Sequence, residues 1–263
     1  MSYRLRPEER TGAGLRRIAR EQGANAVARF DDPENPFPDQ VHALRTTCKK
    51  MRAMLQLVGT AGGDAEQHFR DAARSVSAIR DQHVQADWLG DDGEKPVPIN
   101  ERDRLAVQQA IAQIQAGLAA MSLPPPDTQG LACLQGGFRA TLSRCQEALR
   151  RAEERPVDHR YHRLRKWTKY HWYQLRLLRS LRPELENRLS AMKDISEDLG
   201  LAQDYAVLEA QMSEREDSDP VALVELHKRK KKLQKRSRKA CDHWFEKPVS
   251  LGAGTPDNSD TGQ

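Results

Sequence analysis

The stretch VHALRTTCKKMRAMLQLV, residues 41–58, carries two patterns that together decide the expected fold. Its apolar residues recur at alternating spacings of three and four, which predicts an amphipathic helix with one buried stripe. A basic set recurs at the same spacings and consists of His42, Arg45, Lys49 and Arg52. At about 100° per residue, these four side chains lie within roughly 80° of one another on a helix. We call them the first ladder, and we expect it to run beside the apolar stripe.

A similar stretch, YHRLRKWTKYHWYQLRLL, follows at residues 161–178. A shift of 120 residues aligns its basic residues with the first ladder, pairing His162 with His42, Arg165 with Arg45 and Lys169 with Lys49. The fourth position differs, because Trp172 stands where the first copy has Arg52. We call His162, Arg165 and Lys169 the second ladder. The repetition predicts two halves built on one plan, each centred on an H-x-x-R-x-x-x-K helix.

Helical patterns separated by breaks fill the rest of the chain, and no segment alternates as a strand would. We predict an all-α fold with helices at residues 7–30, 41–58, 65–89, 101–121, 131–154, 158–180, 184–199 and 221–246. Residues 203–214 continue or restart the seventh helix, for which Gly200 is the predicted C-cap. The proline-rich break SLPPPDTQG separates the halves, which gives a four-helix N-terminal half at 1–125, a four-helix C-terminal half at 126–248 and a disordered tail at 249–263.

The chain is rich in charged residues, and its basic residues are clustered along the sequence. Charged residues make up 31% of the 263 residues, the net charge is +5, and residues 228–239, KRKKKLQKRSRK, hold nine basic residues in twelve. Basic charge arranged in stripes indicates an anionic partner such as nucleic acid, a membrane surface or polyphosphate. No apolar run approaches about 18 residues, and the N-terminus lacks an apolar signal core. We therefore expect a cytoplasmic protein with no membrane span.

Catalytic and metal-binding motifs do not emerge from the sequence. It contains no Walker A, G-x-S-x-G or H-E-x-x-H motif and no paired-carboxylate signature. A metal site needs three or four converging ligands, and His159 and His162 have only Asp158 as a nearby third group. The four cysteines form no C-x-x-C pair, which favours buried reduced thiols. We predict a non-enzyme that uses no cofactor and no metal.

Four segments, in this order and spacing, resemble the CHAD family, named for a conserved-histidine α-helical domain. They are VHALRTTCKKMRAML at 41–55, HRLRKWTKYHWYQLRLLRSLRPEL at 162–185, MKDISEDLGLAQDYAVL at 192–208 and FEKP at 245–248. The resemblance covers residues 3–248. It implies two pseudo-symmetric four-helix up-and-down bundles with a basic central groove or pore. It also implies binding of inorganic polyphosphate, often at polyphosphate granules, with phosphate or sulfate as other occupants of the site.

His42, Arg45 and Lys49 match the family's motif in the first half, and His162, Arg165 and Lys169 match it in the second. Tyr170 and Trp172 stand where many members carry further basic residues. Many relatives join this domain to a triphosphate-handling domain with an E-x-E-x-K signature. That signature is not found in this sequence. The resemblance therefore implies the binding module alone.

A row of basic side chains suits a linear polyanion, because Arg offers a planar fork to two oxygens and Lys offers a mobile charge. The predicted polyphosphate-binding residues are Arg16, Arg17, Arg20, His42, Arg45, Lys49, Arg52, Arg139, His162, Arg165, Lys166, Lys169, Lys228 and Lys232. The alternative is a general polyanion or nucleic-acid binder, since phosphate contacts need no sequence code. Against nucleic acid, the aromatic residues do not line the basic stripes as a base-stacking platform would, and we expect only Trp172 and Tyr173 to lie close to them. A membrane-surface role is a third alternative.

Overall fold

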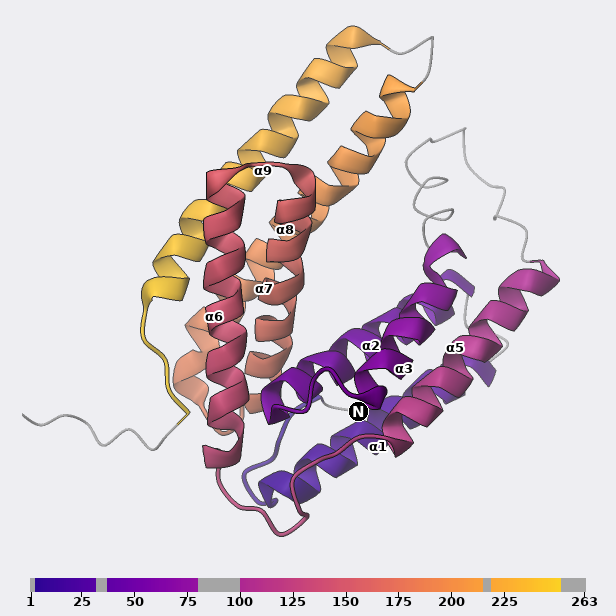
Figure 1. Ribbon diagram of the computed structural model, residues 1–263, viewed down its shortest axis with the longest axis vertical. Coiled ribbons are helices and arrows are strands. Elements are labelled where there is room, and N and C mark those ends of the chain that lie inside the picture. Colours follow the sequence, from indigo (N-terminus) through magenta and orange to yellow (C-terminus); the bar gives the residue numbers. More distant parts are fainter. Residues whose placement is uncertain (1–2, 32–36, 80–99, 215–218, 252–263) are drawn as a thin grey trace, which may run out of the picture.

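The computed structural model describes residues 3–31, 37–79, 100–214 and 219–251 (Figure 1). Every regular element in these ranges is helical, which confirms the predicted all-α class. The elements are α1 (Thr11–Asp31), α2 (Phe37–Val58), α3 (Asp64–Ser75), α5 (Glu101–Ala119), α6 (Ala132–Glu154), α7 (Asp158–Leu178), the short 3-10 helix η1 (Pro183–Leu185), α8 (Glu186–Ser213) and α9 (Pro220–Glu246).

The helix that carries the first ladder forms as predicted, and it begins earlier than expected. It starts at Phe37, and Pro38 occupies its first turn, where a missing backbone N–H removes no intrahelical bond. The predicted apolar stripe packs inward, with Val41, Leu44 and Met51 among its buried members. Burial of this stripe fixes the rotation of α2 and hence the direction of its ladder.

Several predicted boundaries differ from the structure, beginning with the first helix, which starts at Thr11 and not at residue 7. The third helix pauses after Ser75, with Val76 in a turn before residues 77–79 become helical again; its predicted continuation to residue 89 lies outside the described residues. The predicted end at Gly200 is wrong, because α8 continues through it to Ser213. The tail begins with ordered packing, since Leu251 is buried and its N–H donates to Gln135 Oε1 at 2.6 Å. Residues 252–263 lie outside the described ranges.

Two groups of helices meet through α2. One group contains α1, α2, α3 and α5, and the other contains α6, α7, α8 and α9, with α2 packing against both α6 and α7 (Figure 1). The hairpin of α8 and α9 extends beyond the ends of α6 and α7. The boundary near residue 125 and a pseudo-symmetric relation between the groups stay predictions.

The crossing of α2 and α6 is unusually close. A Cβ atom built on Gly137 would lie 2.1 Å from the backbone oxygen of Leu57. Beside this crossing, the buried amide of Gln174 donates to Thr141 Oγ1 at 2.8 Å and to the Ala53 backbone oxygen at 3.3 Å. Gln174 therefore links α7 to α6 and α2 at the point where the two groups meet.

A buried histidine lies in the same core. His171 is 0% exposed, and its ring lies 5.1 Å from the ring of Phe138. Burial, and to a lesser extent the charge of Arg188, lowers the pKa of His171 from 6.5 to about 3. His171 is therefore neutral in the folded protein at neutral pH.

Replacing His171 with leucine is expected to make stability less sensitive to mild acid. A histidine with a lowered folded pKa is protonated only in the unfolded chain below pH 6.5, so its folding stability falls as pH drops from about 6.5 toward 3. Between pH 7 and pH 5 this group alone costs about 2 kcal/mol. Urea unfolding at both pH values should show that H171L lacks this loss, and an unchanged pH dependence would contradict the assignment.

Candidate functional site

The packing of α2 against α7 brings residues of the two ladders together. Lys49 of α2 lies close enough to His162 of α7 to help lower the pKa of that imidazole, after the larger effects of burial and Arg165. Farther along, Arg52 lies 5.5 Å and Lys166 5.8 Å from the centre of the Tyr170 ring. Positive charges separated by more than 100 residues in sequence thus share one region of the structure.

Helices α3 and α8 position two of the ladder arginines. Arg45 Nη1 donates to Ser77 Oγ at 3.0 Å and to the Ala73 backbone oxygen at 3.4 Å. A Cβ on Gly200 would lie 3.0 Å from Arg165 Nη2, so the guanidinium of Arg165 packs against the bare backbone of α8. Gly200 therefore provides space for a ladder side chain, which explains why a glycine occupies a helix interior.

Lys169 is held in a strongly positive and largely buried environment. Burial, and then the charge of Arg165, lowers the pKa of Lys169 to about 8. Its Nζ lies 4.0 Å from the centre of the Trp172 ring, and Arg176 lies 4.8 Å from the same ring. A cation on an aromatic face is stabilised by the ring's quadrupole, which offsets part of the cost of burial.

Lys50 also belongs to this region, although the sequence pattern did not predict it. Burial, followed by Arg176 and Arg29, lowers the pKa of Lys50 to about 8. Its Nζ donates to Gln22 Oε1 at 2.5 Å and lies 5.5 Å from the Tyr3 ring. Lys50 lies about 100° from Lys49 around the helix, so ladder spacing could not reveal it.

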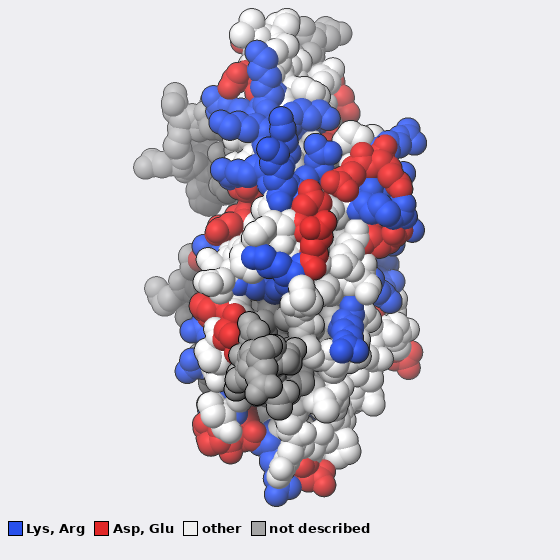
Figure 2. Space-filling view, turned by 90° about the vertical axis from the view of Figure 1, so that its left-hand side faces the viewer, with Lys and Arg blue, Asp and Glu red and all other residues white. Residues whose placement is uncertain are grey.

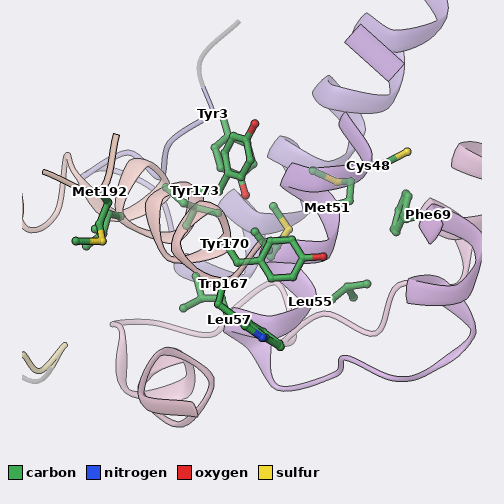
Figure 3. Packing of buried hydrophobic residues seen from close by; sticks show 14 of the residues in the cluster. Tyr3, Cys48, Met51, Leu55, Leu57, Phe69, Trp167, Tyr170, Tyr173 and Met192 are labelled. Atoms are coloured by element: carbon green, nitrogen blue, oxygen red, sulfur yellow. The ribbon is translucent and has the colours of Figure 1, made fainter. Parts of the chain in front are cut away.

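Aromatic rings accompany the second ladder. Trp172 and Tyr173 lie beside Lys169 as expected, whereas the expectation that only these two lie close is wrong, because Trp167 and Tyr170 do so as well. Trp167 lies 4.8 Å from Arg144 and 5.1 Å from Lys166. Figure 3 shows Trp167 and Tyr170 projecting from α7 toward α2, among buried apolar side chains. Trp167 and Tyr170 are buried. Their rings therefore pack beneath the cations on the protein side, and bases could not stack on them.

A carboxylate lies at the end of the first ladder. Glu66 Oε1 pairs with Arg52 at 3.2 Å and Arg70 at 3.5 Å, while Gly62 N donates to Glu66 Oε2 at 2.8 Å. Burial alone would raise the pKa of Glu66, but the Gly62 hydrogen bond and Arg52 lower it overall. The charge of Arg52 is therefore partly neutralised by Glu66.

The predicted arginines of α1 and α6 have varied surroundings. Arg16 Nη2 donates to the backbone oxygens of Leu123 and Pro124 at 3.1 and 3.0 Å, which ties α1 to the proline-rich break. Arg17 pairs with Glu9 at 2.6 Å and Glu21 at 3.1 Å. Arg20 and Arg139 are exposed. Anion binding by these four residues stays a prediction.

The basic run of α9 divides into paired and exposed side chains. Lys230 is buried and donates to Asp158 Oδ2 at 3.1 Å and to Glu209, and Arg236 pairs with Asp198. The predicted binding residues Lys228 and Lys232 are exposed. Figure 2 shows Lys and Arg side chains gathered over this part of the surface. Some side chains of the run therefore form ion pairs that hold α9 to its neighbours, and the others face solvent.

The described ranges contain no group of three His, Cys, Asp or Glu residues that could hold a metal ion. Within the same ranges, no helix is both long and apolar enough to cross a membrane. Cys48, Cys145 and Cys241 are buried free thiols, as expected, whereas Cys133 is exposed, so the prediction of buried thiols is wrong for that residue.

Replacing Gly200 with alanine is expected to weaken anion binding while leaving the fold at least as stable. The added methyl group would require Arg165 to move by a few tenths of an ångström. In a helix interior, alanine is favoured over glycine by about 1 kcal/mol. Thermal unfolding and a polyphosphate titration of G200A separate the two effects; unchanged affinity would mean that the position of Arg165 is unimportant for binding.

Comparison with known protein families identifies the family of this chain. The model of the CHAD domain family matches residues 14–213, a range that contains both ladder helices and ends with the last residue of α8. Helix α9 and its basic run lie outside the match. Among curated proteins, none shows significant similarity to this chain.

Proposed function

This chain belongs to the CHAD domain family, and we propose that it binds inorganic polyphosphate along its two ladders without turning it over. The observation that carries the proposal is the convergence of α2 and α7, which places Lys49 near His162, and Arg52 and Lys166 at one aromatic ring. A linear polyanion can contact cations of both helices at once. Family membership supports the same ligand class.

The electrostatics of the site favour an anionic ligand. Lys169 is largely buried and close to other cations, which makes its charged form less favourable in the free protein than in water. Polyphosphate carries a negative charge on each internal phosphate, so it would relieve the repulsion among these cations. Hydrogen bonds that involve a charged group contribute about 1.5–3 kcal/mol each when shielded from water.

Polyphosphate binding is expected to take up protons at pH 8.5. Lys50 and Lys169 have pKa values of about 8 in the free protein, and nearby phosphates raise the pKa of an ammonium group. A group whose pKa rises on binding gains a proton above its free pKa, so affinity should fall as pH rises through about 8. Calorimetry in two buffers of different ionisation enthalpy measures this uptake. Proton release, or no exchange, would contradict the proposal.

The absence of turnover is proposed because the sequence contains no motif for a nucleophile or catalytic metal, and the family implies a binding domain. Purified protein should release no orthophosphate from polyphosphate. Steady release that disappears on a single ladder substitution would show an active site. We further propose that the protein is cytoplasmic and is recruited to polyphosphate granules through the same ladders, so that a fluorescent fusion should leave the granules when the ladders are altered.

General polyanion or nucleic-acid binding is the second candidate. The observation that favours it is the row of exposed lysines on α9, which includes Lys231, Lys235 and Lys239. Such a surface binds phosphates of any source, with an affinity that falls steeply with salt. Trp167 and Tyr170 are buried and unavailable for base stacking, whereas Trp172, half-buried beside Lys169, offers a ring edge at the second ladder. The α9 surface therefore predicts a weaker, less selective interaction than the ladders do.

A further inference from the structure

A polar pocket of about 220 Å³ lies between α1 and α2. Three of its lining residues are basic, namely Arg29, His42 and Lys50, and the described residues of the lining include no acidic side chain. The remaining lining residues are small or uncharged: Gln22, Asn25, Ala26, Ala43, Thr46 and Thr47. We call this the α1–α2 pocket.

Buried polar groups fix the inner wall of the pocket. Gln22 is only 3% exposed, and its Oε1 accepts a hydrogen bond of 2.5 Å from Lys50 Nζ. Tyr3 donates its hydroxyl hydrogen to the Lys50 backbone oxygen at 2.9 Å and presents its ring to the same ammonium group. Lys50 is thus held at the pocket by contacts on two sides. Thr47, also buried, adds a hydroxyl to this wall.

The pocket is continuous with the first ladder through His42, which belongs to both. On a helix, His42 and Lys49 differ by about 20° in direction, and they are seven residues apart. A chain of phosphates that starts in the pocket could therefore pass His42 and continue along the ladder. The pocket lies alongside the His42–Lys49 part of that path, since its lining on α2 runs from His42 to Lys50. Glu66 pairs with Arg52, beyond this part of the ladder.

The number of basic side chains in the pocket indicates which phosphate of the polymer it would bind, an internal or a terminal one. An internal phosphate has two non-bridging oxygens and a single negative charge. A terminal phosphate has three such oxygens, and its second ionisation, with a pKa near 6 in phosphate monoesters, gives it a charge between −1 and −2 at neutral pH. Three basic side chains together with hydroxyl and amide donors match the terminal group better than the internal one.

We propose that the α1–α2 pocket binds a terminal phosphoryl group, so that one end of polyphosphate is held between α1 and α2 while the following phosphates run along the first ladder. This inference rests on the proposed function, because it places the end of the same polymer. Orthophosphate and the γ-phosphate of a nucleotide present the same chemical group. The polymer end is favoured over both because only the polymer also reaches the ladder.

The test compares polyphosphate of one length with free ends against the same polymer with both terminal phosphates converted to alkyl phosphoramidates. Wild-type protein should bind the free-ended polymer about tenfold more tightly, the effect of losing a charge-assisted contact. In R29Q the two polymers should bind equally. In R104Q the difference should persist, because Arg104 is also exposed, on α5, but neither lines the pocket nor belongs to the predicted binding residues. Both variants should keep wild-type helical content, since neither side chain is buried.

Each outcome either supports or overturns the assignment of the pocket to the polymer end. Equal binding of both polymers to wild-type protein would overturn the pocket assignment and leave polyphosphate binding intact, and so would an end preference that survives R29Q. Failure of both polymers to bind would overturn the proposed function and the pocket together. A further arm uses orthophosphate and ATP as competitors: displacement of free-ended polymer by either compound at equal phosphate concentration would assign the pocket to a small phosphate compound and overturn the polymer end.

Discussion

Replacing Lys49, Arg165 and Lys169 with alanine is expected to weaken polyphosphate binding by about 1,000-fold at physiological salt. These three residues come from both ladders and are only partly exposed. Charge-assisted contacts in a shielded site contribute at least about 1.5 kcal/mol each, so three of them contribute about 4.5 kcal/mol. Fluorescence anisotropy with labelled polyphosphate measures the loss, and circular dichroism should show unchanged helical content.

The matched control removes the same charge from the exposed side of α9. Lys231, Lys235 and Lys239 are spaced by four residues and exposed, and exposed ion pairs are each worth about 0–1 kcal/mol. At a mid-range value of about 0.5 kcal/mol each, the control should lose roughly tenfold in affinity. Lys230 is unsuitable for it, because its removal would leave Asp158 and Glu209 without their buried partner. A control that loses as much affinity as the ladder variant would identify a diffuse polyanion binder.

Replacing Gly137 with alanine is expected to destabilise the fold by about 3 kcal/mol, near the upper end for an overpacked site. The new Cβ would lie 2.1 Å from the Leu57 oxygen and 2.3 Å from the Gln56 oxygen, both of them backbone atoms of α2 that cannot rotate away. For a protein of this size, the melting temperature should fall by roughly 6–12 °C. Thermal unfolding followed by circular dichroism measures the change.

Gly136 provides the control for this substitution, because it precedes Gly137 in α6 and a Cβ there would meet nothing within 4 Å. The G136A variant should be as stable as wild type, or more stable by up to about 1 kcal/mol through helix propensity. Equal stability of the two variants would show that α2 and α6 do not cross as closely as the structure indicates.

The sequence predicted the helical class and the two ladder helices because both depend on local periodicity. Val41 and Leu44 recur with the spacing of a buried stripe, and the copy at 161–178 repeats that spacing. Burial of the stripe then determines where the ladder points. The same logic could not locate the end of α8. Gly200 is typical of a C-cap in sequence, whereas its actual role depends on Arg165, a neighbour only in three dimensions.

The composition of the site was harder to predict than its helices. Lys50 lies outside the ladder spacing, and its importance depends on Gln22 and Tyr3, which arrive from other segments. The basic run of α9 gives the reverse case, a cation that the sequence pattern leaves available but the fold does not. Local charge density could not show that Lys230 is buried in ion pairs. Charge patterns therefore indicate a ligand class, while the pairing of each cation depends on tertiary contacts.

Competition between long polyphosphate and double-stranded DNA tests the central claim most directly. Both polymers are supplied at the same phosphate concentration and at physiological salt, because ionic affinities depend on salt. If the ladders form a site for polyphosphate, it should displace labelled DNA from wild-type protein at far lower phosphate concentration than unlabelled DNA requires. The K49A/R165A/K169A variant should lose that preference, and the K231A/K235A/K239A variant should retain it. Equal displacement of wild-type protein by the two polymers would contradict a polyphosphate-selective site.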